Sequence, residues 1–468
     1  MALKTKKLSV LILAAGQGTR MKSRWPKVLH PVAGQALLHH VVSSAKGLKP
    51  TAVSVIIGHQ GQEVQAALGS WDSKISVFWQ KRQRGSGDAV RQAASWLKRQ
   101  GGEVLILCGD TPLLRTETLK SLLVAQRQGG HAVTVLTGAV SDPTGYGRIV
   151  RTSDGSLLDR IVEERDASPG IREIREINTG VYCFDVRALL SALPKLRADN
   201  AKGEYYLTDV IEILKAAGLS AGACLCSDPE EALGVNRRRD LAQAEKVMRR
   251  RIIERWMDEG VTFVDPDSTY VQAGVKIGSD TVIQPGTHLL GQSVLGSGCR
   301  VGPFAYLQDC FLADNVQFVA SFARQARVGE GVRVGPFSHL REGTVIASGA
   351  HVGNFSEIKK SRIGKGSKIN HLSYIGDATV GDGVNIGAGT ITCNYDGWQK
   401  FRTVIGAGSF IGSNVNLVAP VSVGSGSVVG AGSTITKSVP AGALALERAP
   451  QVIKKGWAKK RRAEKENH

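Results

Sequence analysis

The chain contains 468 residues, of which 42% are hydrophobic and 22% are charged. These proportions exclude wholesale disorder and are typical of a folded globular protein. The 55 glycines, set against only 6% aromatic residues, favour many tight backbone corners over a large aromatic core. A net charge of +19 predicts anionic partners, which could be nucleic acid, an anionic membrane or phosphorylated metabolites.

The seven cysteines are scattered and form no CxxC pair. We therefore expect reduced thiols in a cytoplasmic protein. The sequence has no apolar run of about 18 residues, the length that a membrane-spanning helix needs. The apolar run from Leu8 to Ala15 is followed by GQGTR. Since a secretory signal would end in a small-residue cleavage site, this run is interpreted as a buried strand.

Short apolar runs alternate with amphipathic stretches up to about residue 236. Strands are predicted at 8–14, 52–57, 75–78, 104–108, 132–137 and 180–184, and helices at 88–99 and 117–127. This alternation indicates an α/β, Rossmann-like domain over residues 1–236, with a mostly parallel sheet covered by helices on both faces. Ligands are then expected at the carboxyl ends of the strands.

Two charged segments lie outside the predicted domains. Residues 237–260 place Leu241, Met248, Ile252 and Trp256 near one side of a helix, and most of the others are charged. We predict a half-exposed linker helix whose arginines form a solvated face and do not grip nucleic acid. The basic C-terminal tail, 453–468, is interpreted as disordered and solvated; a contact with nucleic acid or membrane is the alternative.

A six-residue period begins after residue 261 and is the strongest pattern in the chain. One inward side chain every six residues fits a short strand followed by a sharp corner. Three such strands form one coil of a parallel β-helix, which we predict over residues 261–452. The period itself leaves the handedness open.

The recurring aliphatic or aromatic positions fall into runs separated by slips of phase. They are Ile277, Ile283, Leu289, Leu295, Val301 and Leu307; Val316, Phe322, Val328, Val334, Leu340, Ile346, Val352 and Ile358; Ile363, Ile369, Ile375, Val380 and Ile386; and Ile405, Ile411, Leu417, Val423, Val429 and Ile435. Residues 387–404 interrupt the period, so we predict that they loop out of the coil and mark a place for a site.

The sequence LAAGQGTRM, residues 13–21, follows the first predicted strand. It lacks the Gly-Lys-Ser/Thr of a Walker A loop, and Met21 stands where a dinucleotide fingerprint has its third glycine. Taken alone, this Gly-x-Gly also fits a plain structural turn. Arg20 and Lys27 add two cations to the loop, which suits a triphosphate whose charge grows on the departing pyrophosphate.

LAAGQGTRM and the following PKVLH resemble the signature of nucleotide-sugar pyrophosphorylases. Together with the hexapeptide half, residues 8 to about 457 resemble the bifunctional N-acetylglucosamine-1-phosphate uridyltransferase/glucosamine-1-phosphate acetyltransferase family. The resemblance rests on the segments CGDTPLL, DPTGYGRI, IVEERDA, EINTGVY, GEYYLTD and GVNRR. It implies a left-handed β-helix and a homotrimer with acetyl-transfer sites at the subunit contacts.

The resemblance also implies a reaction sequence. Glucosamine-1-phosphate would be acetylated from acetyl-CoA, and UMP would then pass from UTP to N-acetylglucosamine-1-phosphate, with release of pyrophosphate. Mg²⁺ would be the cofactor of the second step. The product, UDP-N-acetylglucosamine, is a precursor of the cell wall and outer envelope.

Matched position by position, the resemblance implies a nucleotide site whose metal ligands are Asp110 and Asn236. The residues that would bind the nucleotide and UDP-sugar are Leu13, Ala14, Ala15, Gly16, Arg20, Lys27, Gln80, Gly85, Ser86, Cys108, Gly109, Asp110, Gly147, Glu163, Asn178 and Asn236. Taken alone, Asp110 after a glycine would equally fit a turn, so the resemblance decides its assignment.

The resemblance likewise implies an acetyl-transfer site with His371 as general base, because the amine of glucosamine-1-phosphate must lose a proton before it attacks the thioester. Taken alone, His371 would fit a structural role. The expected sugar-phosphate residues are Arg341, Lys359, Tyr374 and Asn385. The expected acetyl-CoA residues are Ala388, Asn394, Tyr395, Ser413, Ala431 and Arg448.

Three residues depart from the family pattern. Cys108 stands where the family often has a hydroxylated or aromatic residue, Ser86 where it has Thr, and Gln17 where it has Lys. Gln17 removes one cation from the phosphate loop, which predicts weaker triphosphate binding but not loss of the reaction.

Two other functions fit parts of the sequence. One is a single-activity pyrophosphorylase for another sugar, in which the β-helix serves assembly or regulation. The intact acetyl-transfer residues, His371 among them, argue against it. The other is a basic scaffold that binds nucleic acid through the arginine-rich helix and the tail, but interleaved aromatic residues and a nucleic-acid module are both missing.

Overall fold

The computed structural model describes residues 6–466, which form two compact units, one up to residue 251 and one from residue 252. The division falls within helix α9 (Arg238–Asp258). The boundaries expected from the sequence, 236 and 260, flank this helix. None of the helices between residues 6 and 466 is long and apolar enough to cross a membrane.

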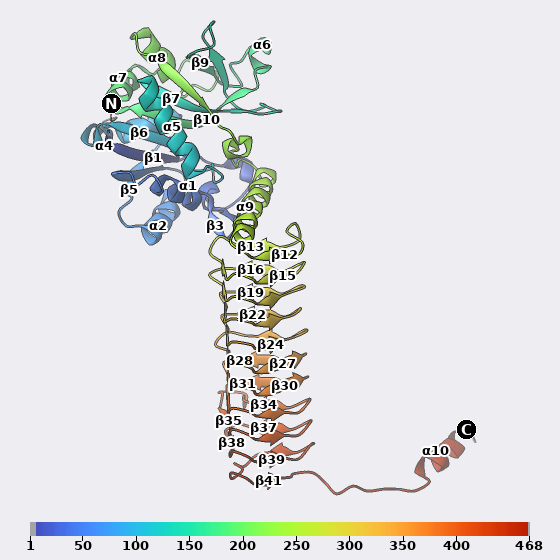
Figure 1. Cartoon of the computed structure of the whole chain (residues 1–468). Helices are drawn as coiled ribbons and strands as arrows, with labels where there is room; N and C mark the ends of the chain where they lie inside the picture. Colours follow the sequence, from blue (N-terminus) through green and yellow to red (C-terminus); the bar gives the residue numbers. More distant parts are fainter. Residues whose placement is uncertain (1–5, 467–468) are drawn as a thin grey trace. The chain divides into compact units, whose positions relative to one another are not determined.

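The first unit is built on a nine-stranded sheet (Figure 1). Its main path is β11 (Ala221–Leu225), β7 (Val133–Ala139), β10 (Glu176–Asp185), β6 (Glu103–Cys108), β1 (Leu8–Ala14), β4 (Ala52–Ile57) and β5 (Ser76–Trp79), and β8 (Arg148–Arg151) and β9 (Leu158–Val162) extend it from β10. The six predicted strands are all present. The pairs that β1 makes with β4 and β6 are parallel, whereas β10 runs antiparallel to β6 and β7.

Helices cover both faces of this sheet because successive strand residues point to opposite sides. Leu11 packs in one core with Trp96 of α4, and its neighbour Ile12 packs in the other with Leu38 of α1. The helices are α1 (Leu37–Lys46), α2 (Gly61–Trp71), α3 (Ser86–Gln92), α4 (Ala94–Gln100), α5 (Thr116–Gly129), α6 (Pro169–Arg172), α7 (Val186–Ala192) and α8 (Val210–Ala216). The single helix predicted at 88–99 is wrong in one respect, since Ala93 leaves the helical conformation and separates α3 from α4.

The second unit is a stack of coils, each with one short strand in each of three parallel sheets (Figure 1). The first sheet holds β12 (Thr262–Phe263), β15 (Val282–Ile283), β18 (Arg300–Val301), β21 (Gln317–Phe318), β24 (Arg333–Val334), β27 (His351–Asn354), β30 (Lys368–His371), β33 (Asn385–Ile386), β36 (Phe410–Ile411), β39 (Val428–Val429) and β41 (Leu444–Ala445). The second holds β13 (Tyr270–Val271), β16 (His288–Leu290), β19 (Tyr306–Gln308), β22 (Phe322–Arg324), β25 (His339–Leu340), β28 (Glu357–Lys359), β31 (Tyr374–Gly376), β34 (Ile391–Cys393), β37 (Asn416–Val418) and β40 (Thr434–Ile435). The third holds β14 (Lys276–Ile277), β17 (Val294–Leu295), β20 (Phe311–Leu312), β23 (Arg327–Val328), β26 (Val345–Ile346), β29 (Arg362–Ile363), β32 (Ala378–Val380), β35 (Thr403–Ile405) and β38 (Val421–Val423).

The inward side chains confirm the predicted period with three corrections. Val316 precedes its strand, and Phe318 takes the inward position of that coil, paired with Val301 and Val334. Phe322 is only partly buried, and Ala323 fills the core of its coil; Phe322 stacks instead on Tyr306, with ring centroids 4.2 Å apart. The looped segment is also shorter than 387–404. β34 continues the coil with Thr392 pointing inward, where its hydroxyl accepts the Gly376 N–H at 2.7 Å. The strand was not predicted because its inward residue is polar and therefore does not belong to the apolar period.

The C-terminal tail forms helix α10 (Trp457–Glu466), so the prediction of disorder is wrong for this stretch. Ala, Lys, Arg and Glu are strong helix formers, and Arg461 pairs with Glu464 one turn later at 3.1 Å. No side chain of α10 is buried. The helix is therefore solvated, as expected for the tail.

Candidate active sites

A cleft of about 550 Å³ lies at the carboxyl ends of β1 and β6 in the first unit. This is the edge at which the strand pattern predicted a ligand. The predicted residues that line the cleft are Leu13, Ala14, Ala15, Gly16, Arg20, Lys27, Gln80, Gly85, Ser86, Cys108, Asp110 and Asn236. Gln17, Gln83, Lys202 and Glu204 also line it and were not predicted as binding residues.

The glycine-rich loop positions the cations of the cleft. Gly18 has φ +63°, and a Cβ there would lie 2.7 Å from the Cβ of Lys27, so only glycine lets the two segments approach. The Lys27 ammonium donates to the Asp110 carboxylate and, at 3.2 Å, to Oδ1 of Asn236. Arg20 donates to the same amide oxygen at 2.8 Å. Two cations thus converge on the two predicted metal ligands.

Gln80, Gly85 and Ser86 lie together at the start of α3. The buried Gln80 amide nitrogen donates to the Gly85 carbonyl at 3.0 Å and to Asp88 at 2.8 Å, which leaves its carbonyl oxygen to accept a base N–H. Gly85 has φ +105°, and a Cβ there would lie 2.5 Å from the Tyr205 carbonyl oxygen. The Ser86 hydroxyl accepts the Leu207 N–H at 3.0 Å.

The predicted sugar-binding residues form a second group. The Asn178 N–H donates to the Gly147 carbonyl at 2.8 Å, and a Cβ on Gly147 would lie 3.5 Å from Glu163 Oε1. Burial raises the pKa of Glu163 above its usual value. These three residues do not line the 550 Å³ cleft; Glu163 lines a neighbouring cavity of about 700 Å³.

Cys108 stands between the two groups of residues. Its thiol lies 3.4 Å from the Gly180 carbonyl oxygen, in the strand that also carries Asn178. Burial raises the pKa of this thiol to about 12, so the group stays neutral at physiological pH. Gly109, the next residue, lies against the end of β1, with its N–H 2.9 Å from the Leu13 carbonyl oxygen.

In the second unit, His371 ends β30 at the corner between the first and second sheets. Its Nδ1 lies 2.7 Å from Oδ1 of Asn354, which faces it from the preceding coil. An amide oxygen can only accept, so Nδ1 carries the proton and Nε2 is left as a proton acceptor. Sequence reasoning missed Asn354.

Cations gather at the opposite edge of the second sheet. Arg341 pairs with Glu357 at 2.8 Å. Lys359 lies beside Lys400, which belongs to the loop that projects between β34 and β35 (residues 394–402). The contact with Lys400 is the larger cause that lowers the pKa of Lys359, and desolvation is the smaller one. Tyr374 lies between the two edges, on the strand after His371. Lys400 was not predicted, because one lysine in a polar loop carries no distinctive signal.

The predicted acetyl-CoA residues fall into two groups. Ala388, Ser413 and Ala431 occupy the same corner of successive coils, joined by hydrogen bonds from Asn414 N–H to the Ala388 carbonyl at 2.7 Å and from Gly432 N–H to the Ser413 carbonyl at 2.8 Å. Arg448 donates to the Ala431 carbonyl at 2.9 Å.

The other predicted residues lie outside this corner. Asn394 is buried, with its amide nitrogen 2.5 Å from the Asp377 carboxylate, whereas Tyr395 is exposed in the projecting loop. Asn385 pairs with Lys368 in the first sheet. The structure thus brings Ala388, Ser413, Ala431 and Arg448 together, and leaves Asn394 and Tyr395 on the far edge of the second sheet.

Comparison with known proteins agrees with this division into two sites. Residues 10–204 match the MobA-like NTP transferase domain, and residues 274–309, 325–360 and 402–437 match the bacterial transferase hexapeptide family of six repeats. The chain is therefore a nucleotidyltransferase joined to a hexapeptide-repeat acyltransferase, and its second unit is a left-handed β-helix.

The chain belongs to the bifunctional GlmU family. It is 49% identical to the "Bifunctional protein GlmU" of Heliobacterium modesticaldum over 96% of this chain and 98% of the relative. The protein of the same name from Exiguobacterium sibiricum is 50% identical over 95% of this chain and 98% of the relative. The family resemblance, the fold class and the two-domain enzyme expected from the sequence are confirmed.

Proposed function

We propose that this enzyme makes UDP-N-acetylglucosamine in two steps. It acetylates glucosamine-1-phosphate from acetyl-CoA and then transfers UMP from UTP to N-acetylglucosamine-1-phosphate, which releases pyrophosphate. The observation that carries the proposal is the presence on one chain of the Lys27–Asp110–Asn236 cluster and of the His371–Asn354 pair. The product class fits the supply of cell-wall precursors.

Asp110 and Asn236 would hold the Mg²⁺ ion of the uridylyl-transfer site. One carboxylate and one amide oxygen suit Mg²⁺, which usually keeps its remaining positions for water and substrate phosphate. Lys27 donates to both of these side chains and Arg20 donates to the Asn236 amide oxygen, which supports a site built for cationic charge. When bound, the ion would offset negative charge on the phosphates.

The uridylyl transfer needs no general base, because the attacking sugar phosphate is already an anion. Its oxygen forms a bond to the α-phosphorus of UTP, and the bond from that phosphorus to pyrophosphate breaks. Arg20 and Lys27 would stabilise the departing pyrophosphate, while Gln80 would accept the N–H of the uracil ring. Glu163 and Asn178 would hold the sugar.

In acetyl transfer, Nε2 of His371 would take the proton of the glucosamine amine. The amine nitrogen then bonds to the thioester carbon, and the carbon–sulfur bond breaks to release the thiolate of CoA. Arg341, Lys359 and Lys400 would clamp the sugar phosphate, and the backbone N–H near Ala388 would stabilise the oxyanion. Tyr374 lies between these two groups, where the sugar would bind.

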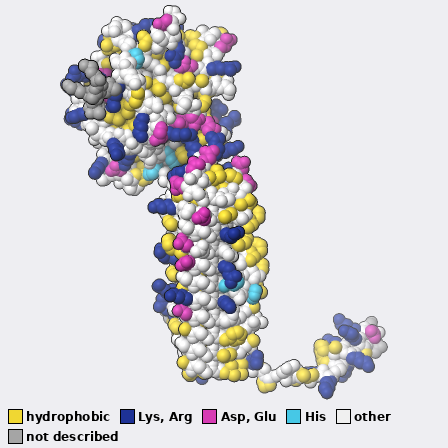
Figure 2. Space-filling model, in the orientation of Figure 1, with side chains coloured by type: hydrophobic (Ala, Val, Ile, Leu, Met, Phe, Trp, Pro, Cys, Tyr) yellow, Lys and Arg dark blue, Asp and Glu magenta, His cyan; other side chains and the backbone are white. Residues whose placement is uncertain are grey.

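We further infer a homotrimer. Phe304, Phe337, Phe355 and Leu372 lie on one corner of the coils with φ between 47° and 60°, and their exposed fractions are 73%, 61%, 55% and 62%. The rings of Phe337 and Phe355 stack with centroids 5.6 Å apart. Figure 2 shows hydrophobic side chains gathered along this unit. Apolar residues in such a conformation suit burial by another copy of the chain, and the corner leads directly to His371.

A cytoplasmic location is also inferred, because the seven cysteines are all free.

A single assay tests the proposed function. The purified protein is incubated with glucosamine-1-phosphate, acetyl-CoA, UTP and Mg²⁺, and products are separated by mass. We expect UDP-N-acetylglucosamine, with no product when acetyl-CoA is left out and N-acetylglucosamine-1-phosphate alone when UTP is left out. If the protein forms UDP-N-acetylglucosamine only when N-acetylglucosamine-1-phosphate is supplied, the proposed acetyl-transfer activity is wrong. Formation of neither product would reject both steps.

A further inference from the structure

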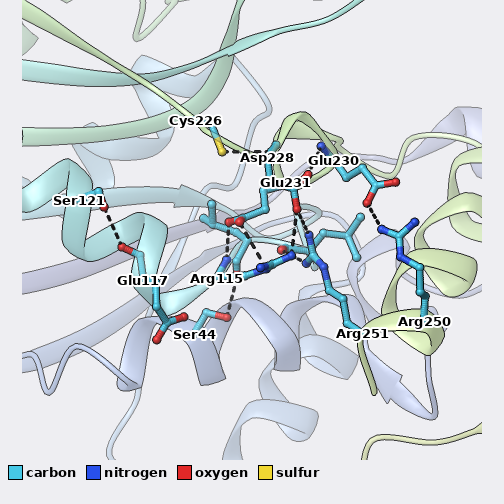
Figure 3. Close-up of polar contacts among 12 residues, drawn as sticks. Ser44, Arg115, Glu117, Ser121, Cys226, Asp228, Glu230, Glu231, Arg250 and Arg251 are labelled. Atoms are coloured by element: carbon cyan, nitrogen blue, oxygen red, sulfur yellow. Dashed lines mark hydrogen bonds and ion pairs between the residues drawn. The ribbon is translucent and has the colours of Figure 1, made fainter. Parts of the chain in front are cut away.

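Four charged side chains form a network that links the segments carrying Asp110 and Asn236 (Figure 3). They are Arg115, Asp228, Glu231 and Arg251, and we refer to them as the arginine–carboxylate network. Arg115 precedes α5, Asp228 caps and Glu231 lies within the short helix η4 (Pro229–Ala232), and Arg251 lies on α9. Neither reaction described above uses these residues.

The contacts of the network join three segments of the chain. Glu231 is 2% exposed, and its carboxylate accepts the Arg115 backbone N–H at 2.8 Å and pairs with the Arg115 guanidinium at 3.4 Å. Asp228 accepts from Arg115 at 2.9 Å and from Arg251 at 2.8 Å. Arg251 also donates to the Leu113 carbonyl at 2.6 Å. Every member thus holds the 110–115 segment to η4 or to α9.

Both segments lead directly to the predicted metal ligands. Asp110 begins the segment that ends at Arg115, and Asn236 follows η4 by four residues. A single backbone hydrogen bond, from Val235 N–H to the Asp110 carbonyl at 2.9 Å, joins the two segments close to the cleft. The arginine–carboxylate network is the second connection between the 110–115 segment and the segment from η4 to Asn236. It therefore fixes the relative positions of Asp110 and Asn236.

We propose that Glu231 and Arg251 are positioning residues for uridylyl transfer. They hold the Asp110 and Asn236 loops at the separation that suits one cation and the substrate phosphates. This inference rests on the proposed function of the first unit. It assigns a role in the reaction to a cluster of charges that touches no substrate.

The Glu231→Gln substitution tests the proposal with little change of shape. Glu231 faces two donors, the Arg115 N–H and guanidinium, and an amide offers only one accepting atom for them. One donor is therefore left without its partner, and the 110–115 segment shifts. Because small misplacements of reacting groups are costly, we expect kcat for uridylyl transfer to fall about tenfold or more.

Arg250→Met is the matched control. Arg250 is the chain neighbour of Arg251, and the ion pair that Figure 3 draws for it is with Glu230 of η4, outside the arginine–carboxylate network. We expect this variant to keep both activities. A general loss of stability in α9 would affect the Arg250 and Arg251 variants alike, whereas a positioning role separates them.

Two readouts distinguish positioning from folding. The first is the Mg²⁺ concentration at half-maximal rate, which should rise in Glu231→Gln and in Arg251→Met. The second is calorimetric binding of UDP-N-acetylglucosamine with and without Mg²⁺, in which the increase of affinity due to Mg²⁺ should shrink. Acetyl transfer by the same proteins should stay at the wild-type rate.

The inference is overturned if Glu231→Gln keeps the wild-type rate and Mg²⁺ dependence. It is also overturned if both nucleotide affinities fall equally, since that indicates a structural role. Should Glu231→Gln not fold, Arg251→Lys keeps the charge but cannot reach both Asp228 and Leu113, and is judged by the same readouts. A wild-type protein without uridylyl transfer would instead reject the proposed function.

Discussion

Oδ1 of Asn354 lies 2.7 Å from Nδ1 of His371, one coil away in the β-helix. The bond fixes both the orientation of the imidazole and the nitrogen that carries the proton. The hydrogen bonds of Asn354 in the structure are with His371 and, through its backbone carbonyl, with the Leu372 N–H. Its effect on acetyl transfer therefore passes through His371.

Removing this bond should slow acetyl transfer selectively. We expect Asn354→Ala to lower kcat for acetyl transfer by about 10–100-fold, the range seen when a supporting hydrogen bond is lost, and to leave uridylyl transfer unchanged. His371→Ala should cost about 10²-fold or more, since the proton acceptor itself is gone. Steady-state kinetics of the two half-reactions measure both effects.

The pH profile of Asn354→Asp provides the sharper test. A carboxylate beside Nδ1 stabilises the positively charged imidazolium form of the ring. The acid limb of kcat/KM for acetyl transfer should then move to higher pH, because only the neutral imidazole can accept the proton. An unchanged acid limb would mean that the Asn354–His371 bond does not act on the proton acceptor.

The second prediction concerns the nucleotide site. Asp110→Asn removes the carboxylate that contacts the Lys27 ammonium. It also removes the charge of one of the two proposed metal ligands. Uridylyl transfer should fall by at least about 10²-fold, and acetyl transfer should be spared. Asp142→Asn, on an exposed turn, is the control. Equal loss of both activities in Asp110→Asn would argue against its assigned role.

The sequence predicts the framework of these sites more fully than their contacts. β1 and β4 have the predicted bounds because each is an apolar run with a single serine that is followed within two residues by a glycine. The antiparallel direction of β10 could not be predicted, since an apolar run does not state its direction. The break at Ala93 could not be predicted either, because alanine favours a helix. In the structure its φ of −99° and ψ of 6° end α3.

The missed site residues have a common cause. Asn354 and His371 are 17 residues apart, one coil of the β-helix, so their contact follows only when the coil length is known locally. Most inward positions follow one another at six residues, but some steps are five, such as those from Leu307 to Leu312 and from Phe318 to Ala323. A one-residue slip exchanges the inward and outward faces of a strand, and no polar pair can be assigned across coils until each slip is placed.

The third prediction uses the buried thiol of Cys108. Its pKa rises from 9.0 to about 12 in the folded protein, so folding favours the neutral form. That stability is complete below pH 9 and is lost as the pH rises toward 12. Between pH 7 and pH 10 the wild type should lose about 1.4 kcal/mol of unfolding free energy relative to Cys108→Ser. Urea denaturation at the two pH values measures the difference.

Cys393→Ser is the control for this comparison, because desolvation raises the pKa of the Cys393 thiol less than it raises that of Cys108. Its stability relative to the wild type should change less between the two pH values. If the free energy of unfolding of Cys108→Ser changed between pH 7 and pH 10 by the same amount as that of the wild type, the thiol would ionise as readily in the folded state as in the unfolded state. Its uridylyl transfer at pH 7.5 should stay within about threefold of the wild type, because a neutral thiol supplies no charge to the phosphates.

The last prediction tests the proposed trimer. Phe337 and Phe355 stack on one another while remaining 61% and 55% exposed, so two carboxylates in their place would prevent another copy from covering the corner. Light scattering should give the wild type about three times the chain mass of 49.9 kDa, and Phe337→Asp/Phe355→Asp a single chain mass. Because the corner leads to His371, the double variant should also lose acetyl transfer by about 10²-fold while keeping uridylyl transfer. Val404→Asp, at a 42% exposed apolar residue on the third sheet, should leave the mass unchanged. A double variant that keeps the wild-type mass would place the subunit contact on another face of the coils.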